Sequence, residues 1–135
     1  MADKLIHLEI VTPRKIDFSD EVKSFTAPGT EGGFQILPNH APFISTIGIG
    51  KVKFVTKDNV EKEFATSGGV VEVHDNKISM LAETIEPKED IDVQRAREAK
   101  ERAAKKLEAA HGHDIDIAKI ALLRALNRLK VAGSE

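Results

Sequence analysis

Cysteine, tryptophan and tyrosine are absent from the 135 residues. The lack of cysteine excludes a disulfide framework, a thiolate nucleophile and cysteine-ligated zinc, and it is compatible with a reducing cytoplasm. Stacking platforms for nucleic-acid bases would depend on the six phenylalanines alone. Because the formal net charge of −2 gives no overall basic field, nucleic acid is not expected as a ligand.

Long apolar runs are missing as well. The first residues have no apolar segment of secretory-signal length, and the roughly twenty consecutive apolar residues of a membrane span occur nowhere. We therefore expect no direct membrane insertion. A chain of this length buries one modest core, which excludes two full-sized catalytic domains.

The composition changes abruptly at Pro87. Residues 1–87 carry 9 Lys+Arg against 13 Asp+Glu, net −4, whereas residues 88–135 carry 11 against 9, net +2. Every phenylalanine and proline lies at or before Pro87, and five of the six arginines follow it. Strand and turn residues give way to helix formers there, so the predicted domains are residues 1–86 and 87–135.

The first domain is predicted to be an antiparallel β-sandwich or flattened barrel, which makes the chain an α+β protein. The alternation of Ile6, Leu8 and Ile10 has the period of a half-buried strand, and Asp58-Asn59 and Asp75-Asn76 are typical turns. The predicted strands cover residues 5–11, 15–18, 22–27, 33–37, 44–49, 51–56, 60–66, 69–73 and 77–82. So many short strands indicate a sandwich or barrel.

The second domain is predicted to be a helical hairpin. Asp90 or Asp92 caps a first helix that runs to about Ala110, and Asp114 caps a second helix that reaches about Val131. The connection between the helices is short, which favours an antiparallel pair.

Apolar stripes at three- and four-residue spacing predict the seam between the helices. The first helix contributes mostly small side chains, namely Ala96, Ala99, Ala103, Leu107 and Ala110. The second contributes Ile115, Ala118, Leu122, Ala125, Leu126 and Leu129. Such a seam buries little apolar area, so opening the hairpin costs little free energy.

A second apolar face of the second helix is made of Ile117, Ile120, Leu123 and Val131. Two interpretations stay open. The face packs on the β domain, or it meets another protein when the hairpin opens.

Few residues are arranged for catalysis, and no catalytic residue is assigned. The glycine-rich residues 28–33 lack the Lys and Ser/Thr of a phosphate loop and are typical of a β turn, while Gly68-Gly69 indicates a turn or bulge. His111, His113, Asp114 and Asp116 are metal-ligand types, but an interhelical turn favours the same polar residues, so no metal is expected.

Four arginines form a candidate phosphate site. Arg95 and Arg102 are two turns apart on one helix, and Arg124 and Arg128 are one turn apart on the other. Guanidinium forks suit phosphate oxygens, so a converging set would bind a nucleoside triphosphate, with Asp92 orienting Arg95 or contacting the nucleotide. On spacing alone, ordinary helix-surface charges remain the simpler interpretation.

Taken together, the motifs of this chain resemble the ε subunit of bacterial F-type ATP synthases. The segments that carry the resemblance are Val11-Thr12-Pro13, residues 36–42 (ILPNHAP), residues 67–73 (SGGVVEV), residues 91–96 (IDVQRA) and residues 124–129 (RALNRL). They occur in the family's order and span nearly the whole chain.

The resemblance implies a non-catalytic rotor subunit of the central stalk, peripheral at the cytoplasmic face of the bacterial membrane. The sandwich of such a subunit binds γ and touches the ring of c subunits, which couples proton translocation to ATP synthesis. Its hairpin lies folded or extends along γ towards the α and β subunits and inhibits ATP hydrolysis.

The resemblance also implies particular contact residues. Glu31, Gly32 and the turn around His40 match the region that contacts the c ring and γ. No cofactor is required, but some members bind ATP as a regulatory ligand, and the matching residues here are Glu86, Ile91, Asp92, Arg95, Arg102, Arg124 and Arg128.

Two other classes of function remain as alternatives. The arginine set is compatible with a stand-alone ATP-binding regulatory module. A metal-dependent hydrolase would use His111, His113 and Asp116.

Overall fold

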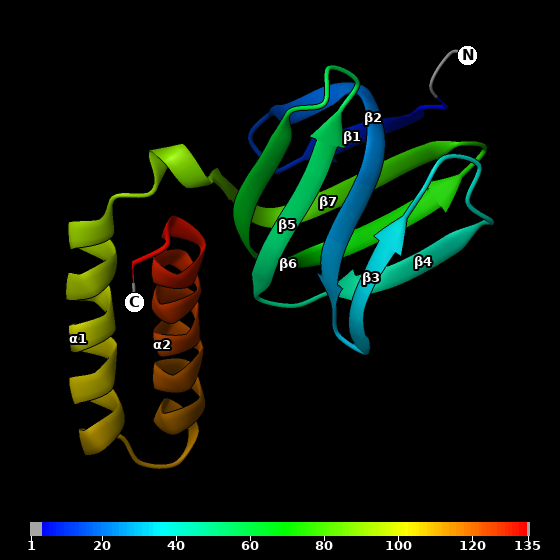
Figure 1. The fold of residues 1–135 in the computed structure, drawn as a ribbon. Helices are drawn as coiled ribbons and strands as arrows, with labels where there is room; N and C mark the ends of the chain where they lie inside the picture. The colour runs from blue at the N-terminus through cyan, green and yellow to red at the C-terminus, as the bar shows by residue number, and fades with distance from the viewer. Residues whose placement is uncertain (1–3, 135) are drawn as a thin grey trace. The chain divides into compact units, whose positions relative to one another are not determined.

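A computed structural model describes residues 4–134 and divides the chain after Pro87 into two compact units (Figure 1). The first unit contains the strands β1 (Ile6–Val11), β2 (Ile16–Gly29), β3 (Gly32–Ile36), β4 (Phe43–Ile47), β5 (Gly50–Thr56), β6 (Glu61–His74) and β7 (Lys77–Pro87). The second contains the short 3-10 helix η1 (Lys88–Asp90) and the helices α1 (Val93–Ala109) and α2 (His113–Ala132). The sandwich-then-hairpin order and the α+β class are confirmed.

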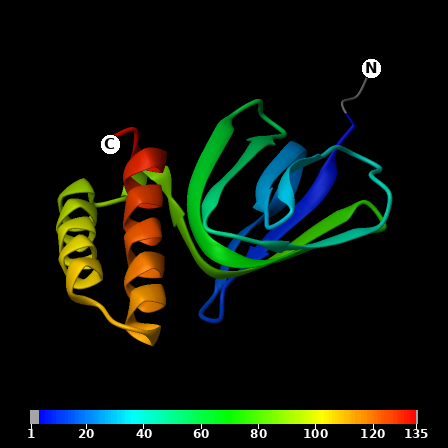
Figure 2. The ribbon, with the colours of Figure 1, turned by 90° about the horizontal axis from the view of Figure 1, so that it is seen from below.

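Strand pairing closes the first unit into a flattened barrel. β1 pairs with β2, β2 with β5, β5 with β6, β6 with β7, and β7 with β1. β3 and β4 extend the layers by pairing with β2 and β6. Figure 2 shows the strands curling into this barrel.

Two pairs of predicted strands are single long strands, so the prediction of nine strands was wrong. Residues 15–18 and 22–27 belong to β2, and residues 60–66 and 69–73 belong to β6. Each long strand changes partner along its length, as β6 does from β5 to β4 at the register shifts around Gly68 and Gly69. The bulge interpretation of these glycines is therefore confirmed, and it bends the strand around a corner of the barrel.

One strand pair is parallel, whereas the sequence predicted antiparallel pairing throughout. β1 and β7 run in the same direction, with Leu8 beside Ile78 and Ile10 beside Met80. The two strands come from opposite ends of the unit, so no hairpin turn constrains their relative direction.

Alternating side chains fill the space between the layers. Ile6, Leu8 and Ile10 of β1 are fully buried, as are Phe25 of β2 and Phe54 of β5. This single cluster takes residues from β1 to β7, which explains why the first unit is compact.

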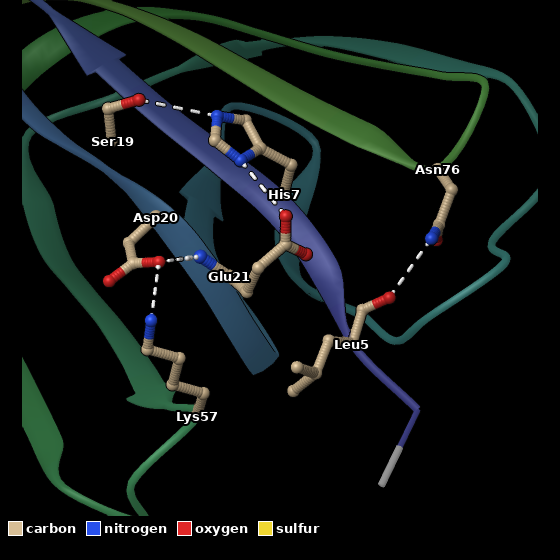
Figure 3. Close-up of polar contacts among 7 residues, drawn as sticks. All are labelled: Leu5, His7, Ser19, Asp20, Glu21, Lys57 and Asn76. Carbon is tan, nitrogen blue, oxygen red and sulfur yellow. Dashed lines mark hydrogen bonds and ion pairs between the residues drawn. The ribbon is translucent and has the colours of Figure 1, made fainter. Parts of the chain in front are cut away.

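The predicted turn at Asp75-Asn76 is confirmed. Both residues have positive φ, as a tight hairpin turn requires. The Asn76 side chain donates to the Leu5 carbonyl oxygen at 2.9 Å (Figure 3) and accepts from the Asn39 main-chain N–H at 2.7 Å. It thereby connects the β6–β7 turn to the β3–β4 loop and to the start of the chain.

Of the predicted helix caps, the structure confirms one and contradicts another. Asp92 is the N-cap of α1, because its Oδ1 accepts the Arg95 main-chain N–H at 3.1 Å, while Asp90 lies in η1. The prediction that Asp114 caps α2 was wrong. Gly112, with φ of 58°, is the N-cap, and Asp114 lies in the first turn, where its charge complements the helix dipole.

The small-residue seam between α1 and α2 is present. Ala96, Ala103, Ala118 and Ala125 are buried along the paired helices. One assignment was wrong, because Leu126, predicted in the seam, is 40% exposed. Val131 of the second apolar face is buried, at 4% exposed. The remaining residues of that face, Ile117, Ile120 and Leu123, are exposed.

Candidate nucleotide and subunit-contact sites

The four arginines all belong to the helical hairpin. Arg95, Arg102 and Arg124 are exposed and Arg128 is half-buried. Within residues 4–134, the guanidinium groups of the three exposed arginines make no hydrogen bond or ion pair with the protein. These three donors are therefore available to a ligand.

Helical geometry places the arginines on one side of the hairpin. At about 100° per residue, Arg95 and Arg102 lie roughly 100° from the α1 seam, and Arg124 and Arg128 lie about 90–130° from the α2 seam. Because the two helices are packed antiparallel, these rotations point to the same side (Figure 2). The interior of the hairpin carries none of them, so the side they share is cationic, although the exposed Ile117 lies two turns before Arg124 on the same face of α2.

The other residues of the predicted nucleotide site have structural positions of their own. Ile91 is buried, and the Asp92 carboxylate is engaged in capping α1 through the Arg95 main chain. Glu86 belongs to the sheet unit, in β7, where its register partner is Ala65. All members of the set except Glu86 thus belong to one unit.

The predicted subunit contacts lie at opposite ends of β3. Glu31 is in the exposed turn before the strand, and Gly32, with φ of 127°, is its first residue. His40 is in the loop after the strand, where its ring lies 5.8 Å from that of Phe43, edge to face. Five residues of extended chain separate these points by roughly 17 Å, so they form two sites rather than one.

An apolar face that the sequence analysis missed covers the outside of the sheet. Val11, Val70 and Leu81 lie side by side on β1, β6 and β7. On β4, Thr46 is opposite Val70, and Ile44 lies two residues along the same face, opposite Glu72. We call Val11, Val70, Leu81 and Ile44 the outer apolar face. Ile44 is 69% exposed and Leu81 is 60% exposed, whereas Ile47 of β4 and Met80 of β7 are buried. The long-range strand pairing that assembles this face left no signal in the local sequence.

Polar cross-strand pairs continue the same sheet surface beyond the apolar face (Figure 3). His7 of β1 contacts Glu21 and Ser19 of β2, each at 3.3 Å. Beside them, the Glu21 main-chain N–H donates to Asp20 at 2.7 Å and Lys57 approaches Asp20 at 3.2 Å. These two contacts, the main-chain one above all, lower the pKa of the Asp20 carboxyl below 3.8.

A pocket of about 390 Å³ beside the β1–β2 turn also escaped the sequence analysis. It lies between the β1–β2 turn, residues 12–15, and the β7 segment 83–85, with Asp17 of β2 in its wall. The Asp17 side chain is only 11% exposed, and its Oδ2 is buried without a hydrogen-bond partner among the described residues. A buried carboxylate oxygen without a partner is unusual, because leaving it unpaired costs free energy.

Between residues 4 and 134, no three His, Asp or Glu side chains are grouped so as to hold a metal ion. None of the helices in that range is long and apolar enough to span a membrane.

The fold and its surfaces define a two-part protein, a sheet module with an outward apolar face followed by a two-helix arm with a cationic side. Residues 5–88 match the family described as "ATP synthase, Delta/Epsilon chain, beta-sandwich domain", and residues 89–133 match "ATP synthase, Delta/Epsilon chain, long alpha-helix domain". The chain belongs to the ATP synthase delta/epsilon chain family.

Bacterial relatives match almost end to end. The chain is 46% identical over 125 residues to the ATP synthase epsilon chain of Desulfitobacterium hafniense strain Y51, covering 93% of this chain and 94% of the relative. It is 45% identical over 133 residues to that of Nitratidesulfovibrio vulgaris strain DP4, covering 98% of both.

Solved structures share the fold at lower identity. A chain of the Euglena gracilis mitochondrial ATP synthase, in a structure of OSCP, F1 and c-ring, superimposes with a TM-score of 0.85 at 21% identity, covering 95% of this chain and 81% of that one. A chain of the Tetrahymena thermophila mitochondrial ATP synthase, in a structure of central stalk and c-ring, gives 0.69 at 16%, covering 98% and 99%.

Proposed function

We propose that this protein is the ε subunit of a bacterial F-type ATP synthase, a rotor component that makes and breaks no bonds itself. It binds γ, touches the c ring and couples proton translocation to ATP synthesis at the cytoplasmic face of the membrane. The near end-to-end match to bacterial ATP synthase epsilon chains carries this proposal.

The outer apolar face supports γ as the partner of the sheet module. Ile44 and Leu81 place large apolar side chains in water, a cost that burial by a partner would remove. His40 contacts Phe43 at the start of β4, directly before Ile44 in the chain, but Phe43 packs against the core and so lies on the side of β4 opposite Ile44. Glu31 and Gly32 lie at the other end of β3, which makes them the candidate contact with the c ring.

Binding of the full chain to purified γ tests the proposal. Leu81→Asp should weaken γ binding at least about tenfold, because it puts a charge into an apolar contact. Val60→Asp is the matched control, since Val60 is also half exposed but lies at the β5–β6 turn, outside the outer apolar face. Failure of wild-type protein to bind γ would rule the proposal out, and equal effects of the two substitutions would rule out this face.

The hairpin is the inhibitory arm of the proposed subunit. The seam between α1 and α2 consists mainly of alanines, so separating the two helices exposes little apolar surface. On α2, the exposed side chains of Ile117, Ile120 and Leu123 already offer an apolar strip to the α, β and γ subunits. Deletion of residues 88–135 should raise ATP hydrolysis by the reconstituted complex and leave γ binding intact. Loss of γ binding on deletion would contradict this division of labour.

ATP is the regulatory ligand that the cationic side of the hairpin favours. Four arginines on one side of two helices suit a triphosphate, and they act together only while the hairpin is folded. ATP would therefore stabilise the folded hairpin, with Ile91, Asp92 and Glu86 as further candidates for nucleotide contacts.

Titration of the full chain with ATP, followed by NMR and solution scattering, tests this regulation. Arg128→Ala should weaken ATP binding about 10- to 100-fold, the loss expected for a charged hydrogen bond. Lys119→Ala removes an exposed positive charge from another side of α2 and should change the affinity less than twofold. A wild-type protein that gives no response at millimolar ATP would exclude nucleotide sensing and the stand-alone ATP-binding alternative together.

A further inference from the structure

The two ends of the helical hairpin are packed differently. Ile91, Leu129 and Val131, each at most 8% exposed, lie at the end where α1 begins and α2 finishes (Figure 1). We call these three residues the base cluster. The other buried side chains within residues 88–134 are alanines, and Leu107 and Ile115 near the connection are only half-buried. Because hydrophobic stabilisation follows the apolar area removed from water, the base cluster contributes most to the folded hairpin.

Local structure at the start of α1 keeps Ile91 in this cluster. Asp92 is the N-cap of α1, so Ile91 directly precedes the cap and Ala96 is the fourth helical residue. In a hydrophobic staple, an apolar residue before the cap packs against the fourth helical residue, and Ile91 and Ala96 are both buried. The short helix η1, which leads into Ile91, contacts α2. The chain that enters α1 therefore belongs to the packed end of the hairpin.

The end of α2 is closed by main-chain hydrogen bonds and joined to α1 by a side chain. The Gly133 N–H donates to the Lys130 carbonyl oxygen at 3.1 Å, and the Ser134 N–H donates to the Leu129 carbonyl oxygen at 2.8 Å. With Gly133 in the left-handed region, this is a Schellman motif. The Ser134 hydroxyl in turn accepts a hydrogen bond from the Arg97 guanidinium at 2.8 Å. The last turn of α2 is thus held to α1.

The opposite end of the hairpin is the connection between the helices. His111, Gly112 and His113 are exposed there. Gly112 is the N-cap of α2, with φ of 58° and no side-chain hydrogen bond to the first turn. Since the chain itself joins the helices at this end, α2 can leave α1 only if the end with the base cluster separates.

We propose that the base cluster and the Arg97–Ser134 hydrogen bond form a latch that holds the inhibitory arm folded, with the connection at Gly112 as its hinge. The inference rests on the proposed role of the hairpin as an inhibitory arm. The alanine seam between latch and hinge contributes little apolar area, so it opens when the latch opens. Release of the latch frees α2 to extend and so increases inhibition of ATP hydrolysis.

Thiol labelling of the full chain measures how often the hairpin opens. The chain has no cysteine, so Ala103→Cys places a single thiol in the seam, at a position that is 3% exposed. Iodoacetamide reaches this thiol only in the open hairpin, so the labelling rate follows the open fraction. Leu129→Ala, added to this reference protein, should raise the rate at least about tenfold, because it removes a fully buried side chain. Val131→Ala is a second and milder variant that should raise the rate at least about threefold.

Two leucines of α2 provide matched controls. Leu123→Ala makes the same change at an exposed position and should alter the labelling rate less than about twofold. Leu122→Ala makes it at a half-buried position in the middle of the seam and should accelerate labelling less than Leu129→Ala does. Circular dichroism establishes that each variant keeps its helices, and Val131→Ala decides the matter if Leu129→Ala does not.

The latch is overturned if Leu129→Ala and Val131→Ala both label at the reference rate. It is also overturned if Leu122→Ala and Leu129→Ala accelerate labelling equally, because the stability would then be spread along the hairpin. Labelling needs neither γ nor ATP, so this result is independent of the proposed function.

ATP hydrolysis by the reconstituted complex tests what the latch regulates. Leu129→Ala should lower the hydrolysis rate at least about twofold, because more arms are released, whereas deletion of residues 88–135 should raise it. An unchanged rate in Leu129→Ala, with faster labelling, overturns the regulatory role of the latch. An unchanged rate after the deletion instead overturns the inhibitory arm itself.

Discussion

Gly69→Ala is expected to destabilise the sheet unit severely, through a backbone geometry that no neighbouring side chain can relieve. Gly69 has φ of 152°, and a Cβ at this position would overlap the Leu81 carbonyl oxygen and lie 3.0 Å from the Ala82 Cα. The φ value alone costs an alanine about 1–3 kcal/mol. Both obstructing atoms are main chain in the β6–β7 ladder, so relief requires the ladder to move.

The combined cost is at least about 3 kcal/mol, a large share of the roughly 5–15 kcal/mol that stabilises a domain. Gly33→Ala is the matched control, because its Cβ would meet only the Ala27 carbonyl oxygen, at an ordinary 3.8 Å. We expect this change to be neutral or to stabilise by up to about 1 kcal/mol, through the reduced entropy of the unfolded chain.

Urea unfolding measures both effects. The chain has no Trp or Tyr, so far-ultraviolet circular dichroism and NMR signals of buried sheet methyl groups replace intrinsic fluorescence. The prediction is refuted if Gly69→Ala lowers the unfolding free energy by less than about 1 kcal/mol, or if it changes that free energy as much as Gly33→Ala does. In either case the slope of the unfolding free energy against urea concentration must equal that of the wild type. Either would mean that the bulge adapts to a side chain and does not fix the register that turns Val70 and Leu81 outward.

Three further predictions concern single polar contacts. Asn76→Ala should lower the unfolding free energy by about 1–2 kcal/mol, because two main-chain groups lose the side chain that bonds them, and a urea midpoint equal to wild type would contradict this. Arg97 donates to the Ser134 hydroxyl at 2.8 Å, so Arg97→Ala and Ser134→Ala should each loosen the end of α2, and a double-mutant cycle without coupling would show that the contact is not made in solution. Folding lowers the pKa of the Asp20 carboxyl, so its ionised form stabilises the protein at pH values above its unfolded pKa. That stability is lost as the pH falls through the pKa of the folded state. NMR titration should place the midpoint of Asp20 below 3.8, and Lys57→Ala should raise this midpoint.

Local signals in the sequence were enough for the architecture. Alternation and turn residues located every strand, and Asp92 and the small-residue stripes located the hairpin. Local patterns failed where a residue's role depends on distant partners. β2 and β6 were each divided in two because their polar or glycine interruptions resemble turns, whereas the partners on either side keep the strand extended. Gly112 rather than Asp114 is the N-cap of α2, because the tight connection needs positive φ.

The candidate sites likewise fall into those that local sequence patterns predict and those that depend on distant strands. The arginines were found from helical spacing, which depends on local geometry alone. The outer apolar face and the pocket beside the β1–β2 turn were not predicted from the sequence. Both are formed by strands that are far apart in the sequence and are brought together by pairing such as the parallel β1–β7 contact. Glu31 and His40, near in sequence, proved to lie at opposite ends of one strand.

Propensity and periodicity act over a few residues, so local sequence was enough to predict a sheet-forming segment before Pro87 and a helix-forming segment after it. Which side chains share a surface depends instead on tertiary packing. Register between distant strands sets that outcome, and a shift of one residue would turn Leu81 inward and leave Asp17 without its pocket.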